Sequence, residues 1–183
     1  MQPTSSPAQD LQNLAALWSL GGVRAVEVVD AACNALLAGL DSPALRRLAA
    51  CTRAEADYDV PDFLPAALGE LGLVFYPYGS NAGEEAAARS LVSRMLAGEM
   101  TPRELAFRIH QQFGHDLPLV ERLAAFDDEY DILEYGDKTA EQVDAEVRTE
   151  ALRLAEQSPA QPAGDAGGAG AGSGQAALGR GGF

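Results

Sequence analysis

Apolar residues recur every three or four positions along most of the chain, which is the spacing that places side chains on one face of an α-helix. The first such stripe contains Leu11, Leu14, Ala15 and Trp18. The only strand-like run is at residues 73–76, and it has no evident partner for pairing. The pattern therefore predicts an all-α fold.

Start and stop signals divide these stripes into short helices. The clearest start is at Thr101, where Pro102 and Glu104 follow in the order of a capping box with proline at the first helical position. The fourth helix is expected at residues 61–71, and Asn81 is expected to cap the fifth. The expected helices begin at or near residues 7, 23, 43, 61, 82, 102, 118 and 140. We expect a compact orthogonal or irregular bundle of about 7–8 short helices.

The composition changes sharply near Ser158. The last 26 residues contain nine glycines and seven alanines and almost no large apolar side chain. Such a segment cannot bury a core, so residues 158–183 are expected to form a disordered low-complexity tail. Residues 1–157 are expected to form a single helical domain, which is long enough to fold without a disulfide or metal.

The chain is strongly acidic, with 27 Asp and Glu against 13 Lys and Arg and a formal net charge of −14. This charge repels phosphate backbones and anionic lipids, so neither nucleic acid nor a membrane is an expected partner. No apolar run approaches the ~20 residues of a membrane span, and the first ten residues do not resemble a secretory signal. The only two cysteines, Cys33 and Cys51, belong to no CxxC or Cys/His pattern, so both are expected to be reduced thiols. We therefore expect a cytoplasmic protein.

No motif for nucleophilic catalysis or nucleotide binding is present, so we expect no cofactor and no enzymatic activity. The two histidines, His110 and His115, are five residues apart rather than four. A helical zinc pair normally uses the spacing of four, which favours structural roles for both.

Acidic residues are most concentrated between Asp116 and Glu146, where eleven acids minus two bases leave a net charge of −9. An apolar stripe on the same predicted helix is expected to pack inward; it contains Leu119, Leu123, Phe126, Tyr130 and Leu133. Beside this stripe, Asp127, Asp131 and Glu134 follow at i, i+4 and i+7 and repel one another. We expect this acidic column to face outward and to attract Lys and Arg of a partner.

Aromatic residues cluster at residues 75–79, in a segment expected to be a rigid turn between helices. Tyr76 and Tyr78 flank Pro77 there. Tyrosine offers apolar contact area with a polar tip and is frequent at the centres of protein interfaces. The two rings either cover one end of the bundle or contact a partner.

Two resemblances follow from particular segments. One links the chain, over about residues 23–136, to a family of small, acidic, uncharacterised helical bacterial proteins, and it implies no activity. The segments that carry it are AGLDSPALR at 38–46, LPAAL at 64–68, MTPRELA at 100–106 and FDDEYD at 126–131. The second is a faint likeness of residues 73–77 to the Tyr-Tyr-Pro segment of nuclease-colicin immunity proteins, with Phe75 in place of the first tyrosine and Tyr76 matching the second. This likeness implies a surface that binds a basic protein.

These observations favour a non-enzymatic acidic helical module that binds a basic protein partner, in the manner of an immunity protein or a regulator. Its expected charge partners are Asp127, Asp131 and Glu134, and its expected anchors are Tyr76, Tyr78 and Tyr130. One alternative is a helical enzyme that binds a small molecule or a metal in a pocket between helices, using His110, Arg108 or the carboxylates. Another is a structural bundle that associates with itself through residues 76–78.

Overall fold

A computed structural model of the chain describes residues 6–157, and all regular structure within this range is helical. The helices are α1 (Pro7–Ser19), α2 (Ala25–Leu37), α3 (Pro43–Ala49), α4 (Ala56–Glu70), α5 (Asn81–Leu96), α6 (Pro102–Phe113), α7 (Glu121–Asp131), the short 3-10 helix η1 (Leu133–Tyr135) and α8 (Ala140–Glu156). The all-α prediction is therefore confirmed for these residues. The tail expected at residues 158–183 lies outside the described part of the chain.

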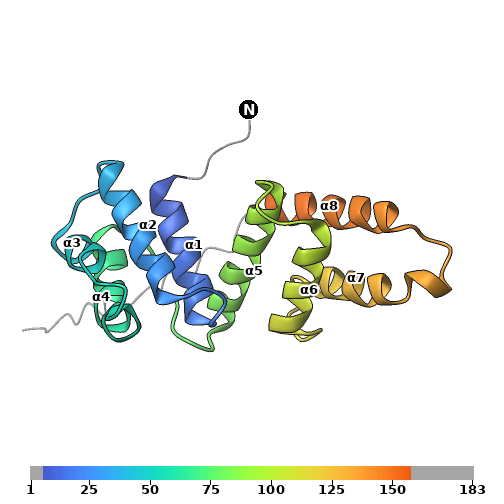
Figure 1. The fold of residues 1–183 in the computed structure, drawn as a ribbon, viewed down its shortest axis with the longest axis horizontal. Helices are drawn as coiled ribbons and strands as arrows, with labels where there is room; N and C mark the ends of the chain where they lie inside the picture. The colour runs from blue at the N-terminus through green and yellow to red at the C-terminus, as the bar shows by residue number, and fades with distance from the viewer. Residues whose placement is uncertain (1–5, 158–183) are drawn as a thin grey trace, which may run out of the picture.

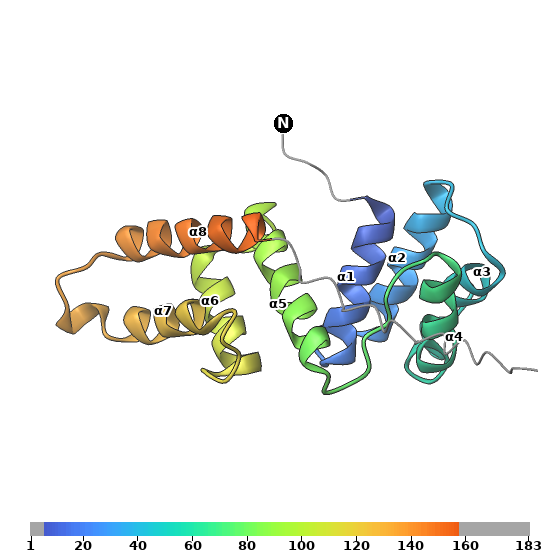
Figure 2. The same cartoon turned by 180° about the vertical axis from the view of Figure 1, so that it is seen from behind.

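The helices form two lobes arranged end to end (Figures 1 and 2). The first lobe contains α1 to α4 around one apolar cluster, in which Leu11, Leu45 and Leu64 are completely buried. The second lobe contains α5 to α8 around another cluster, which includes Ile109 and Phe126. Helix α1 belongs to both: one side of it packs on α2, and its residues Ala16 and Leu17 join the second cluster beside α5.

The local start signals act as the sequence predicts. Ser6 and Ser42 accept hydrogen bonds from backbone N–H groups three residues later, at 3.2 and 3.1 Å. Thr101 and Thr139 form complete capping boxes with Glu104 and Gln142. Each of these contacts satisfies N–H groups that the first helical turn leaves without an intrahelical acceptor. The caps therefore set where α1, α3, α6 and α8 begin.

Helix α4 begins five residues earlier than its proline suggested. It starts at Ala56, so Pro61 and Pro65 lie inside it. Both prolines are exposed and four residues apart, on the side of the helix that faces away from the core. The carbonyl groups that lose their N–H partners there remain accessible to water, while Ala56, Val60 and Leu64 are buried on the other side. Burial on one face thus offsets the two missing hydrogen bonds on the other.

Several other boundaries differ from the sequence prediction, since α2 begins at Ala25 rather than near residue 23 and α7 begins at Glu121 rather than near residue 118. Helix α5 is capped by Ser80, whose hydroxyl accepts from the Gly83 N–H at 3.2 Å, and Asn81 is already its first residue. Helix α7 ends at Asp131, so Glu134 belongs to η1 and does not continue the helix. Among residues 6–157, no helix combines the length and the apolar composition that crossing a membrane requires.

Candidate functional site

The inward stripe of α7 is formed as predicted. Leu123 and Phe126 are buried in the second cluster, and Leu119 and Leu133 pack against its edge. Tyr130 belongs to this stripe and is only 4% exposed. Its hydroxyl donates a hydrogen bond to the Asp144 carboxylate on α8, and Arg103 of α6 lies over its ring at 5.3 Å. Burial and this hydrogen bond raise the pKa of Tyr130. Little of the Tyr130 ring is therefore exposed for contact with a partner.

The three acids of the predicted column differ in exposure, because Asp127 is largely buried while Asp131 and Glu134 are exposed. The side chain of Asp127 is 15% exposed, and its Oδ2 lies 3.0 Å from Nδ1 of His110 on α6. The next residue, Asp128, faces both histidines: Oδ1 is 3.7 Å from His110 Nδ1, and Oδ2 is 3.2 Å from His115 Nε2. Asp127 thus points into the contact between α6 and α7 rather than toward open solvent, whereas the side chain of Asp128 contacts both histidines and is still 56% exposed.

The proximity of the two histidines is a feature that their spacing did not suggest. Their ring centroids are 5.0 Å apart. In an unbroken helix, residues five apart lie on different sides. Here α6 ends at Phe113, and Gly114 adopts φ 56° and ψ −140°. This conformation, which favours glycine, turns the chain so that His115 returns beside His110. The glycine between them was the one signal in the sequence for this arrangement.

The only two bases of the acidic segment are neutralised within the second lobe. Arg122 contacts Glu129 at 3.2 Å and Glu146 at 3.5 Å. Lys138 contacts the same two carboxylates, each at 2.8 Å. The four side chains form one network that links α7 to α8 with no net charge. The negative charge that faces outward must therefore come from the remaining acids.

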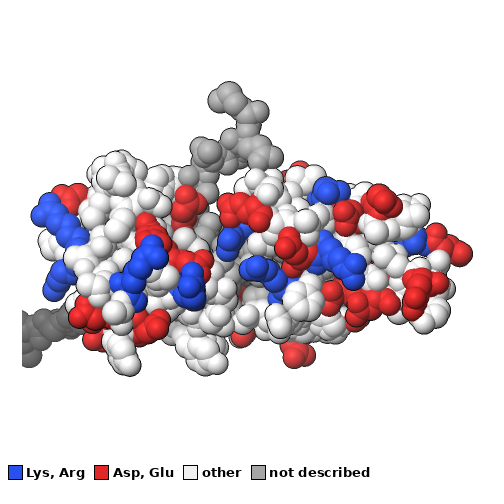
Figure 3. Space-filling model, in the orientation of Figure 1, with Lys and Arg blue, Asp and Glu red and all other residues white. Residues whose placement is uncertain are grey.

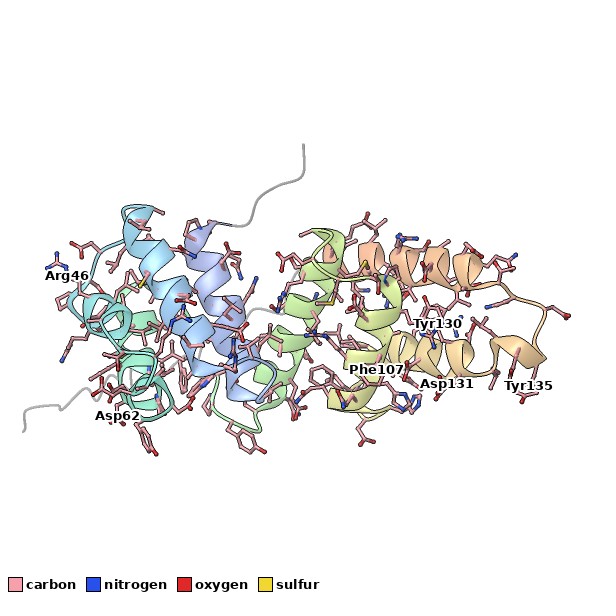
Figure 4. All side chains as sticks on the ribbon, viewed as in Figure 1. Arg46, Asp62, Phe107, Tyr130, Asp131 and Tyr135 are labelled. Carbon is pink, nitrogen blue, oxygen red and sulfur yellow. The ribbon has the colours of Figure 1, made fainter. Side chains whose placement is uncertain are left out.

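Four of those acids surround the turn between α7 and α8, together with two exposed apolar side chains. We call this set the tip surface: Asp131, Ile132, Glu134, Tyr135, Asp137 and Glu141. Ile132 is 58% exposed and Tyr135 is 83% exposed. Figure 4 shows Asp131 on α7 and Tyr135 at the outer end of the molecule, and acidic side chains gather at this end in Figure 3.

The carboxylates of the tip surface have no cationic partner among residues 6–157. The side chains of Asp131 and Asp137 form no ion pair or hydrogen bond there. Glu134 accepts a hydrogen bond from the Tyr135 hydroxyl, which raises the pKa of Tyr135. Hydrogen bonds from the backbone of its own helix end and from Thr139 lower the pKa of Glu141. These hydrogen-bond donors are uncharged and do not neutralise the carboxylates of Glu134 and Glu141. The tip surface is therefore acidic.

The aromatic segment at residues 75–79 divides between the two lobes. Phe75 packs on the first apolar cluster, and Tyr76 packs on the second. Tyr78, by contrast, is 86% exposed. The segment connects α4 to α5, and in both ribbon views it lies away from the turn between α7 and α8 (Figures 1 and 2). Tyr76 and Tyr78 are thus not part of the tip surface.

A groove with a volume of about 310 Å³ lies where α1 meets α5 and α6. Its lining combines apolar side chains such as Leu17 and Leu91 with Arg108, Gln111 and Gln112. Arg108 was one of the groups expected in a pocket between helices. His110 and the carboxylates of α7 do not line this groove.

No family model matches the chain, and no curated protein or solved structure matches it either. The resemblances of residues 23–136 and 73–77 therefore stay predictions. Sequence reasoning missed Ile132 and the pairing of His110 with His115. Ile132 interrupts an acidic segment, but nothing in its position indicated that α7 would end before it and leave it exposed.

Proposed function

We propose that this chain is a non-enzymatic helical module that binds a basic protein through the tip surface between α7 and α8. The observation that carries the proposal is the placement of four carboxylates without cationic partners around two exposed apolar side chains. Charge attracts and orients a partner, and the apolar side chains provide area that binding removes from water.

The charge of the tip surface comes from Asp131, Glu134, Asp137 and Glu141, which together carry four negative charges. The nearest base in sequence, Lys138, is held by Glu129 and Glu146 in the network described above. The tip carboxylates are therefore available to form ion pairs with Lys and Arg side chains of a partner. Such complementarity increases the rate of encounter and excludes acidic proteins, while apolar contacts supply much of the affinity.

The anchors of this surface are Tyr135 and Ile132. Aromatic residues that contact a partner are frequently hot spots, because a single ring buries a large area at a low cost in side-chain entropy. They take the role that Tyr130 was expected to have, since Tyr130 is buried. Asp131 and Glu134 keep their expected role as charge partners. The partner that fits is a protein with Lys and Arg around a pocket for an aromatic ring.

The test is a comparison of two variants with the same change in net charge. The full chain, Asp131→Lys/Glu134→Lys and Asp57→Lys/Asp62→Lys are used as baits in lysate of the native cells, and captured proteins are identified by mass spectrometry. Asp57 and Asp62 are exposed on α4, at the opposite end of the molecule. We expect a basic protein to be captured by the first and third baits and lost from the second.

Two further comparisons measure the contributions of charge and of the Tyr135 ring. Raising salt from about 0.1 M to about 1 M shortens the screening length from about 10 Å to about 3 Å and is expected to weaken capture. Tyr135→Ala is expected to reduce affinity for the purified partner at least tenfold, whereas Tyr58→Ala, which removes an equally exposed ring from α4, is expected to have no effect. Equal capture by Asp131→Lys/Glu134→Lys would refute the proposal.

A further inference from the structure

We propose that His110, His115 and Asp128 form a binding site for a divalent transition-metal ion at the end of α6, where the chain turns toward α7. The site is separate from the tip surface, and each can exist without the other. Its ligands come from the last turn of α6, from the residue after Gly114 and from the middle of α7. A bound ion would therefore link three segments of the second lobe.

The distances between the ligand atoms suit such an ion. One nitrogen or oxygen from each of the three residues can be chosen so that all lie within 4.8 Å of one another. His115 Nε2 and Asp128 Oδ2 are 3.2 Å apart. Two ligands of a tetrahedral zinc ion, each about 2.0–2.1 Å from the metal, are separated by roughly 3.3 Å. This pair is thus already at ligand spacing, and small rotations of the partly exposed His110 and Asp128 side chains would bring the third ligand in.

Asp127 provides an independent reason to place an ion here. Its largely buried carboxylate lies 3.0 Å from His110 Nδ1. When Nδ1 carries the proton of the neutral imidazole, it donates to Asp127, and the lone pair of Nε2 is left for an ion. Without an ion, Asp127 holds the ring toward α7. Carboxylates beside a metal-binding histidine commonly have such a role.

The donor set selects the class of ion. Two imidazole nitrogens with carboxylate oxygens suit zinc, cobalt, nickel or copper, whereas calcium and magnesium prefer sites made of oxygen alone. The two carboxylates also balance the charge of a divalent ion. Cys33 and Cys51, the other strong zinc ligands of the chain, lie in the first lobe, where Cys33 contacts the Ala49 carbonyl at 3.4 Å. They can therefore be removed without touching the proposed site.

The experiment uses the full chain with Cys33→Ser/Cys51→Ser, titrated with Zn²⁺ by calorimetry and with Co²⁺ by visible absorption. We expect one ion per chain, a cobalt spectrum without thiolate bands, and a rise in Tm when zinc is added. His115→Asn and Asp128→Asn are each expected to lower zinc affinity at least tenfold, and Asp127→Asn to lower it roughly 10- to 100-fold. Both His115 and Asp128 are exposed, so their replacement leaves the core intact.

The matched control is Asp116→Asn, which removes the same charge from an exposed residue next to His115 that is outside the proposed site. It is expected to bind zinc as the parent does, because attraction by overall charge is not the source of the affinity. The proposal is overturned if the parent shows no saturable binding tighter than a Kd of about 1 mM. It is also overturned if His115→Asn and Asp128→Asn bind zinc as tightly as Asp116→Asn.

Discussion

The hydroxyl of Tyr130 donates a hydrogen bond to Asp144 across the contact between α7 and α8. This bond joins a residue of the inward stripe to the outer edge of the neighbouring helix, and Arg148 also lies 3.8 Å from the same carboxylate. It explains why a tyrosine within an acidic segment is buried rather than exposed: its ring fills the core while its polar tip still has an acceptor.

Tyr130→Phe is expected to lower the free energy of unfolding by about 0.5–1.5 kcal/mol, because one hydrogen bond is lost while the ring stays in place. Since the folded state raises the pKa of Tyr130 above its ordinary value of 10.0, the wild type should lose stability as the pH rises past 10. Tyr130→Phe has no hydroxyl to ionise, so its free energy of unfolding should fall less over the same pH range. Urea unfolding at pH 8 and above pH 10 measures both effects, with Tyr58→Phe as an exposed control.

Gly114→Ala is expected to destabilise the protein by about 1–3 kcal/mol, because φ 56° with ψ −140° is a conformation that only glycine adopts without strain. It should also move His115 away from His110 and weaken zinc binding. Gly69→Ala is the control, and the opposite effect on stability is expected for it. Gly69 lies in α4 with no atom within 4 Å of an added Cβ, so alanine there should stabilise by about 0.4–1 kcal/mol. Equal thermal stability of the two variants would contradict the strain at Gly114.

Arg89→Met is expected to loosen the end of α8. From α5, Arg89 Nη1 donates to the carbonyl oxygens of Leu154 and Gln157 at 3.0 and 2.7 Å, where α8 has no further N–H donors of its own. Loss of these charged hydrogen bonds should cost about 2 kcal/mol. Arg53→Met, which alters an exposed arginine in the first lobe, should change stability by less than about 0.5 kcal/mol. Hydrogen exchange of residues 150–157 would report whether the loosening is local.

Glu70 is expected to make the stability of the first lobe depend on acid pH. Its carboxylate accepts from the Ala44 N–H at 2.8 Å, and this bond, with help from Ser42, lowers the pKa of Glu70 below its ordinary value of 4.5. Because the pKa of Glu70 is lower in the folded state, its contribution to stability is fully present above the ordinary pKa of 4.5. The contribution is lost as the pH falls through the folded pKa. Glu70→Gln should therefore be less stable than the wild type at pH 7, and the difference should shrink in acid. A constant difference from pH 7 to pH 3 would argue against this account.

The starts of α1, α3, α6 and α8 were predictable because capping is a contact between residues three positions apart. Thr101 with Glu104 and Thr139 with Gln142 form the same boxes in any surroundings that keep the segment helical. The inward stripe of α7 was predictable for a similar reason, since helical spacing alone puts Leu123, Phe126 and Tyr130 on one side. The start of α4 was not, because burial of Ala56 and Val60 against α2 and α3 outweighs the local effect of Pro61.

The candidate sites depended on residues far apart in the chain. Asp127 and Asp131 have the same chemistry and share a helix, yet one faces His110 across the contact with α6 and the other faces solvent. Local spacing defines which residues share a helix face, because a helix repeats every 3.6 residues wherever it occurs. Which charges are neutralised, and which side chains meet, depends on how separate helices pack, and that packing is a property of the whole apolar core.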